Sequence, residues 1–370
     1  MNALNAKISA VLLAVLCVGA PNVRAQDAKA PQLSSLEQQI DYVVGALSES
    51  LRSMDYKMIC MAADGFKAAG LTGKDLEIAV LRAERDAALS GGFMMGGNNA
   101  QIPVLGQVAR GKAGDAKAVE TLRGWAFTEL TPVKAPDFSQ FKDKPAEVLA
   151  AQKASQEYAQ NVQRKQYAFL GLALLKEPGI AEKAIAALRS AAESNQGVPV
   201  MGGGRTDILA LAALTADPKA GIKGLIDLCS DDKAPIQAQV AAIGMLTRLA
   251  PGTKSNKGAD APFSLEGDVS AELPQDTLAQ CSKVYVAVMK RWTPDPKQPN
   301  DPSINQLIQT GYGFPAKTID ADGIAAILAA RDRITGPSAQ WLKPQVDQVL
   351  KQQGVDPNTA QKPPAPPKDF

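Results

Sequence analysis

The residue types that could do chemistry are few in this chain. Among its 370 residues there is no histidine. This excludes Ser/His/Asp and Cys/His nucleophile activation, haem held by histidine, and zinc or iron sites that need histidine ligands. The sequence nominates no catalytic residue, no metal ligand and no cofactor. It therefore favours a protein that is not an enzyme, although it leaves that question open.

A glycine-rich segment is the first candidate for a binding site. Gly202, Gly203, Gly204 and Arg205 precede a predicted helix that begins at Asp207. Free backbone N–H groups at a helix start, next to an arginine, can hold a phosphate, a carboxylate or a partner's acidic group. The segment lacks the GK[ST] ending of a P-loop and follows no predicted strand, so we do not expect nucleotide binding. The alternative is a flexible loop before an ordinary N-cap.

Methionines at helical spacing are a second candidate. Met54, Met58 and Met61 recur at intervals of four and three residues, beside Cys60. Thioether sulfurs are soft ligands that suit Cu(I). A methionine stripe is also typical of a helix core, and we predict packing rather than a metal site.

A third pattern resembles part of a calcium loop. Asp320, Asp322 and Gly323 have the spacing of the middle of an EF-hand loop. The twelfth position of such a loop needs a bidentate glutamate, and here it is Ala329. We predict instead that Asp322 caps the helix that follows it.

The N-terminus has the pattern of a cleavable signal peptide. Lys7 precedes an apolar run from Ile8 to Ala20. This run is shorter than the roughly 20 residues that cross a bilayer. We predict a signal peptide over residues 1–25, cut after Ala25, and a periplasmic or secreted mature protein with no membrane span. A lipid anchor on Cys17 is the alternative, which Leu16 before it disfavours.

The charge balance limits the expected partners, and the cysteine count limits the possible disulfides. Removal of residues 1–25 leaves equal numbers of acidic and basic residues, so neither nucleic acid nor an anionic membrane is an expected partner. Cys60, Cys229 and Cys281 remain, and an odd number leaves at least one unpaired. We expect all three to be buried as small apolar residues.

Apolar residues recur at spacings of three and four from Ser35 to Gln353, which predicts an all-α protein. Strand patterns are nearly absent, with Lys283–Met289 the one stretch that resembles a strand. The predicted helices are Leu36–Arg52, Lys57–Ala69, Lys74–Ser90, Asp115–Leu130, Ala146–Lys176, Ile180–Ser194, Asp207–Thr215, Pro218–Ser230, Pro235–Leu249, Asp276–Arg291, Ser303–Thr310, Asp322–Ile334 and Ser338–Gln353.

Composition divides the chain into segments. After the signal peptide, we predict a flexible N-terminal segment, a helical repeat region, a Pro/Gly-rich linker or insertion, a C-terminal helical region and a Pro-rich disordered tail. The N-terminal segment covers residues 26–34, the repeat region 35–250 and the linker or insertion 251–274. The C-terminal helical region covers 275–353, and the tail covers 354–370.

One helix pair carries a family resemblance. Asp217-Pro218 opens a helix, Asp231-Asp232 lies in a short turn, and a second helix rich in small apolar residues follows from Pro235. This unit resembles a HEAT repeat, although Gln237 stands where that family often has arginine. The resemblance covers about Leu71–Ala250 and implies an α-solenoid of stacked antiparallel helix pairs.

An internal similarity supports repetition. Met95-Gly96-Gly97 and Met201-Gly202-Gly203 lie 106 residues apart, and apolar residues match at the same offset downstream. This predicts a helical module used twice, with both glycine-rich loops on one face.

The function we expect from these patterns is an exported protein-protein interaction or scaffolding module, with an unidentified exported or envelope protein as its partner. The alternative is a periplasmic small-ligand binder or a histidine-independent hydrolase on the same all-α scaffold, because a fold does not fix a function.

Overall fold

The computed structural model describes residues 35–90, 100–131, 145–194, 207–249, 275–292, 302–336 and 339–357. These residues form 14 α-helices and contain no strand, which confirms the all-α prediction. The stretch 283–289, whose pattern resembled a strand, lies inside helix α13 (Thr277–Arg291). The helices fall into two compact units, and each is described by itself.

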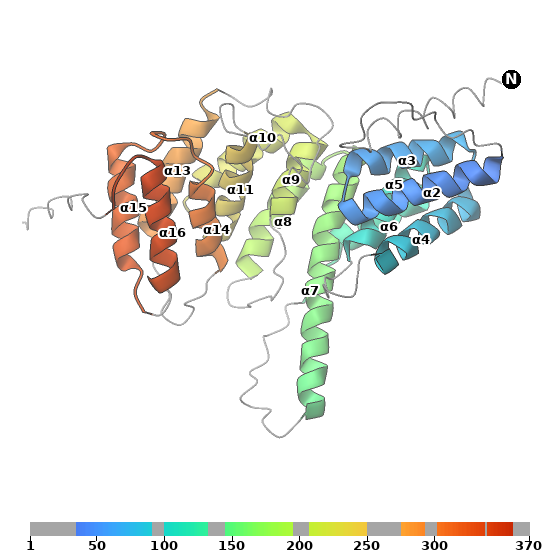
Figure 1. The fold of residues 1–370 in the computed structure, drawn as a ribbon, viewed down its shortest axis with the longest axis horizontal. Coiled ribbons are helices and arrows are strands. Elements are labelled where there is room, and N and C mark those ends of the chain that lie inside the picture. The colour runs from blue at the N-terminus through green and yellow to red at the C-terminus, as the bar shows by residue number, and fades with distance from the viewer. Residues whose placement is uncertain are drawn as a thin grey trace, which may run out of the picture. The chain divides into compact units, whose positions relative to one another are not determined.

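In the first unit each helix packs on its neighbour or on the next but one (Figure 1). Helix α2 packs on α3 and α4, α3 packs on α5, and α5 packs on α4, α6 and α7, while α7 also contacts α6 and α9. These helices are α2 (Leu36–Ser53), α3 (Tyr56–Ala68), α4 (Gly73–Ser90), α5 (Gln101–Ala113), α6 (Ala116–Phe127), α7 (Pro145–Leu174) and α9 (Asp207–Ala216).

The turn between α2 and α3 shows how these pairs are built. Met54 ends α2 in the left-handed conformation, and its N–H donates to the Ser50 carbonyl. Asp55 then caps α3, because its Oδ1 accepts the Met58 N–H at 3.0 Å. Val43 of α2 contacts Gly65 of α3, and both lie equally far along the chain from Met54, so the two helices are antiparallel.

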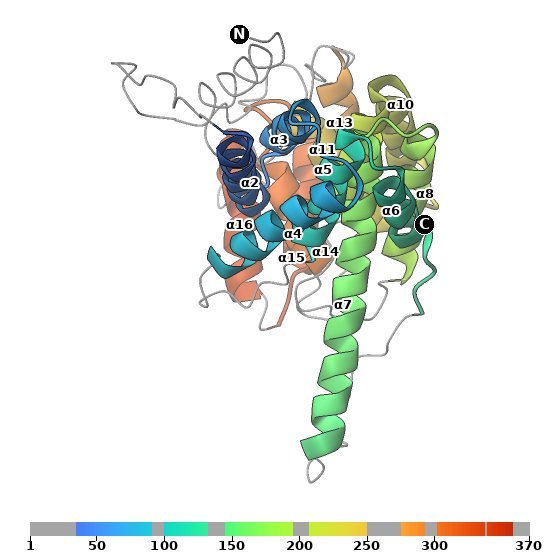
Figure 2. The same ribbon diagram turned by 90° about the vertical axis from the view of Figure 1, so that its right-hand side faces the viewer.

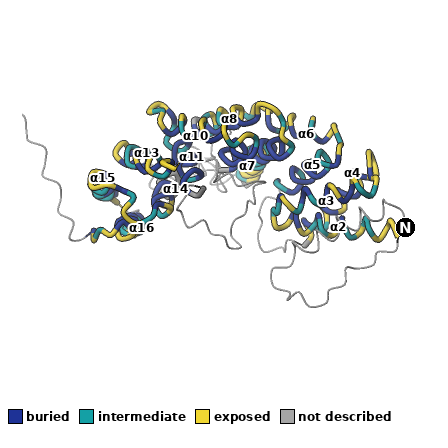
Figure 3. Tube along the Cα trace, turned by 90° about the horizontal axis from the view of Figure 1, so that it is seen from above, coloured by how far each residue is buried: buried dark blue, intermediate teal, exposed yellow. Residues whose placement is uncertain are grey.

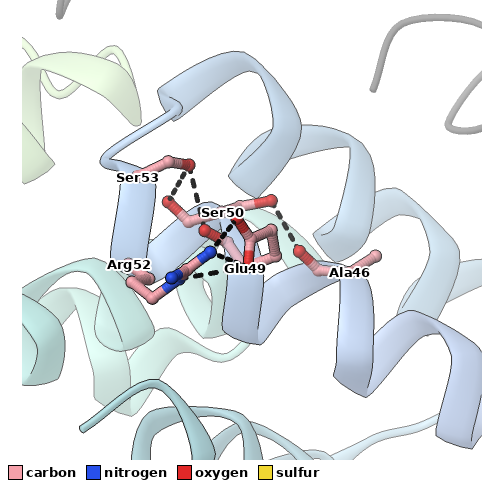
Figure 4. A network of polar contacts seen from close by, with 5 residues as sticks. All are labelled: Ala46, Glu49, Ser50, Arg52 and Ser53. Atoms are coloured by element: carbon pink, nitrogen blue, oxygen red, sulfur yellow. Dashed lines mark hydrogen bonds and ion pairs between the residues drawn. The ribbon is translucent and has the colours of Figure 1, made fainter. Parts of the chain in front are cut away.

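Polar side chains at the end of α2 are satisfied within the helix (Figure 4). The hydroxyl of buried Ser50 donates to the Ala46 carbonyl at 2.6 Å, and that of Ser53 donates to the Glu49 carbonyl at 2.9 Å. Arg52 pairs with Glu49 at the surface. A serine can therefore lie in the α2–α3 core without an unpaired hydroxyl.

The sequence patterns missed helix α5 altogether. Pro103 and two glycines argue against a helix there, but Pro103 lies in the first turn, where no intrahelical N–H bond is lost. The helix is crowded on several sides, and Val104, Leu105 and Val108 are fully buried. A Cβ on Gly111 would lie 2.7 Å from Leu175, so packing requires a residue of low helix propensity.

Helix α7 is a single helix of 30 residues, packed along only part of its length. Phe127 at the end of α6 meets Phe169 with ring centroids 5.5 Å apart, and Lys165 donates to the Thr128 carbonyl. No residue from 146 to 158 is buried, and Leu149 is 66% exposed. Both ribbon views show this part of α7 extending past α5 and α6 (Figures 1 and 2).

The second unit repeats the same kind of packing. Helix α10 packs on α11, α11 packs on α13 and α14, and α15 packs on α13 and α16, while α14 also contacts α16. Along each helix buried and exposed stretches alternate (Figure 3). The helices are α8 (Ile180–Ser194), whose first two residues belong to the first unit, α10 (Pro218–Ser230), α11 (Ile236–Leu249), α13, α14 (Pro302–Gly311), α15 (Ala321–Arg333) and α16 (Ala339–Gln352).

The start of α15 corrects one prediction. The cap is Asp320 rather than Asp322, since Asp320 Oδ1 accepts the Gly323 N–H at 2.8 Å. Gly323 is required by packing, because a Cβ there would lie 2.5 Å from Ile319 Cγ2. Asp322 lies in the first turn of α15, where its negative charge suits the helix dipole.

Candidate functional site

The glycine-rich candidates lie outside the described residues. This applies to Gly202, Gly203, Gly204 and Arg205, and to the related segment around Gly96. Their role in binding an anion or a partner stays a prediction. Among the residues that the structure does describe, no group of three or more His, Cys, Asp or Glu side chains is arranged to hold a metal ion.

The methionines do not form one helical stripe. Met54 occupies the turn between α2 and α3, so only Met58 and Met61 share a helix. Met54 Sδ lies 3.9 Å from the Tyr167 hydroxyl of α7. This contact joins the α2–α3 turn to α7.

The three cysteines are buried and none of them forms a disulfide, as predicted from their expected role as small apolar residues. Burial raises the pKa of Cys281 to about 11 and raises that of Cys229 further still. Because the thiolate is the reactive form, the raised pKa of Cys229 and Cys281 disfavours reaction of these two thiols in the folded protein.

We expect all three cysteines to react slowly with iodoacetamide at pH 8 in the native protein, at least about a hundredfold slower than in denaturant. Mass spectrometry of tryptic peptides would follow the labelling of each residue. A native rate equal to the denatured rate at any of the three would contradict this burial.

The most unusual ionisable group is Glu84 on α4. Its side chain points at α5, where Gly106 leaves room for it: a Cβ on Gly106 would lie 1.7 Å from Glu84 Oε1. This oxygen is buried and has no hydrogen-bond partner among the described residues. Burial raises the pKa of Glu84 to about 7, although the nearby positive charge of Arg110 acts in the opposite direction.

Arg110 lies one turn after Gly106 on α5 and is already paired. Its guanidinium donates to Asp115 Oδ2 at 2.6 and 2.9 Å and to Glu77 at 3.2 Å. Asp115 also caps α6 through the Lys117 N–H. Burial alone would raise the pKa of Asp115, but the bonds from Arg110 and from backbone amides lower it overall.

This group of side chains suits proton binding better than catalysis. A carboxyl with a pKa near 7 has the acidity of a general acid. Oε1 of Glu84, however, faces Gly106 inside the helix interface. The neighbouring carboxylates, Glu77 and Asp115, are both bonded to Arg110, so neither is free to act as its partner.

A second polar cluster fixes the turn between α10 and α11. Gln239, fully buried, donates to the carbonyls of Cys229 and Asp231 at 2.9 and 3.0 Å. Its Oε1 accepts from Arg291 of α13 at 2.9 Å. Arg189 of α8 binds the Asp231 carboxylate, and this bond, with the Lys233 N–H, lowers the pKa of Asp231.

The acidic pair of this turn is therefore structural. Arg291 donates to the Asp232 backbone carbonyl at 2.8 Å, and Asp231 is held by Arg189. The Asp231-Asp232 turn of the HEAT-like unit could be noticed in the sequence. Gln239 is the residue that mainly supports this turn. In the sequence it could have been found only as a glutamine among the apolar residues of α11.

Helix α4 also carries an exposed apolar ridge, defined as Ile78, Leu81 and Leu89. These side chains are 47%, 52% and 75% exposed. Their spacing places them on one stripe, opposite the buried face that includes Leu76 and Val80. These three apolar side chains lie among exposed charged residues such as Arg82 and Arg85, and such a mixture suits an interaction surface.

The described residues thus define an all-helical protein with two packed units and no described metal-binding cluster. Among the described helices, none combines the length and apolar character needed to cross a bilayer. No protein-family profile matches the chain, and no characterised protein or solved structure resembles it at a significant level.

Proposed function

We propose that this chain is an exported helical-repeat protein that binds another protein of the cell envelope. Packing of a helix on its next-but-one neighbour, as α2 packs on α4 and α3 on α5, is what stacked helix pairs produce. The HEAT-like unit and the predicted signal peptide support the same assignment and its location. The exposed ridge of α4 is the observation that carries the binding function.

The ridge favours a partner with an apolar contact surface. The charges beside it are neutralised within the protein, because Arg82 pairs with Asp41 of α2 and Arg85 pairs with Asp86, each at 3.0 Å. Little net charge is left to attract a strongly acidic or basic partner. We therefore expect binding that resists a salt wash.

The alternative of a hydrolase or small-ligand binder has weaker support. Glu84 is the described carboxyl with the acidity for acid catalysis, but its buried Oε1 is enclosed by the α4–α5 interface. A glycosidase would need a second carboxylate available across the substrate. Glu77 and Asp115 are both bound to Arg110.

The test is affinity capture of the tagged mature protein from its own cell envelope, with quantitative mass spectrometry after a salt wash. We expect a double variant, Leu81→Ser with Leu89→Ser, to retain about a tenth or less of the main captured protein, because apolar anchors dominate such interfaces. Its helical circular dichroism should be unchanged, since both side chains are exposed.

The matched control is Leu149→Ser, which removes another exposed leucine of the same unit, on α7. Capture by this variant should equal that of the parent. Undiminished capture by the ridge variant, or an equal loss in the control, would remove the ridge as the binding surface.

A further inference from the structure

The interface between α4 and α5 holds a group that changes charge near neutral pH. The chain has no histidine, and among the described groups with a shifted pKa Glu84 is the one brought to about 7. In other envelope proteins histidine commonly supplies such a response. Here a carboxyl with one oxygen buried between two helices takes its place.

We propose that α4 is a pH-sensitive element: ionisation of Glu84 drives its carboxylate out of the space against Gly106 and loosens α4 from α5. The geometry requires this direction of change. Oε1 of Glu84 is buried against the bare Cα of Gly106 and has no hydrogen-bond donor among the described residues. A negatively charged oxygen that is buried without a donor is costly, and exposure to solvent would supply one.

Neighbouring charges relieve this cost only in part. Four ion pairs on and around α4 leave Glu84 out: Asp41–Arg82 at 3.0 Å, Arg85–Asp86 at 3.0 Å, Arg110–Glu77 at 3.2 Å and Arg110–Asp115 at 2.6 Å. The attraction of Arg110 for Glu84 is real but smaller than the effect of burial.

The sign of the effect follows from the two states of Glu84. Its pKa is about 7 when folded, against 4.5 for the exposed group. The folded state binds the proton more tightly, so protonation stabilises the folded interface. That stabilisation is fully present below pH 4.5 and is lost as the pH rises through about 7.

This inference does not depend on the proposed binding function, although α4 also carries the exposed ridge. The test is hydrogen exchange of the isolated protein, followed by mass spectrometry at pH 5.5 and pH 8. Rates are expressed as protection factors, which removes the intrinsic effect of pH on exchange. We expect protection of the α4 amides to fall about tenfold between the two pH values.

Two variants act on the site in different ways. Glu84→Gln keeps a neutral side chain, and Gly106→Ala places a Cβ where Oε1 lies and sends the carboxyl to solvent. We expect α4 protection to be independent of pH in both. If Glu84→Gln fails to fold, Gly106→Ala still tests whether Glu84 causes the pH dependence.

The matched controls are Glu120→Gln, which neutralises an exposed carboxylate of α6, and Gly124→Ala, which adds a methyl where nothing lies within 4 Å. Both should keep the pH dependence of the parent. Equal protection of α4 at the two pH values in the parent, or an undiminished fall in Glu84→Gln, would overturn the proposal.

Discussion

Replacing Gln239 with alanine should lower the free energy of unfolding by roughly 2–4 kcal/mol. The side chain is fully buried, and its amide donates to the carbonyls of Cys229 and Asp231 while its oxygen accepts from Arg291. Alanine would leave two carbonyls and one guanidinium N–H without these partners and would open a small cavity. Urea unfolding followed by circular dichroism measures the change.

Gln237→Ala is the matched control, because Gln237 lies two residues away on α11 and no hydrogen bond of its side chain contributes to this cluster. Its effect should stay within about 0.5 kcal/mol. Similar losses in the two variants would contradict the support that we assign to Gln239.

Replacing Gln353 with alanine should destabilise the protein by a similar amount, roughly 2–4 kcal/mol. This buried residue directly follows α16 and binds the segment between α14 and α15 at four points. Its Oε1 accepts the N–H groups of Thr318 and Ile319 at 3.1 and 3.2 Å. Its Nε2 donates to the carbonyls of Phe314 and Pro315 at 3.3 and 3.0 Å.

Thermal unfolding gives the simplest measurement, with an expected fall in Tm of roughly 5–10 °C. Gln348→Ala removes an exposed glutamine from the same helix and should leave Tm within about 1 °C. Gln353→Glu is a sharper variant, since it keeps the acceptor but cannot donate to the two carbonyls. Its Tm should be no higher than that of the alanine variant, because a carboxylate oxygen would face the carbonyls of Phe314 and Pro315. A Tm equal to the parent would contradict the role of Nε2.

Most helices could be predicted from the sequence because their ends are marked by local chemistry. Ser35, Asp55 and Asp115 each accept a backbone N–H at a helix start, and such caps are visible as residue types. The bounds of α8 and α10 agree with the predicted ones at both ends. Helix α5 could not be predicted, because its glycines are explained only by side chains outside it, Glu84 of α4 and Leu175 just after α7.

The candidate site was harder to predict for the same reason. Glu84 lies in a charged stretch of α4, and its burial depends on Gly106, which is distant in the sequence. No local pattern reports that two such residues meet. Gln239 left a weak signal as a polar residue among apolar ones, whereas the predicted loop residues Gly202–Arg205 lie outside the described residues.

The exposed N-terminal half of α7 extends a fixed distance from the part of the helix that is packed. Ala159 is the first buried residue of this helix, and Leu149 lies ten residues before it. At a helical rise of about 1.5 Å per residue, Leu149 stands roughly 15 Å along the axis from the point where the helix is anchored. A small rotation of α7 about its packed part would therefore move Leu149, and any molecule bound near it, by several times the displacement of the packed end.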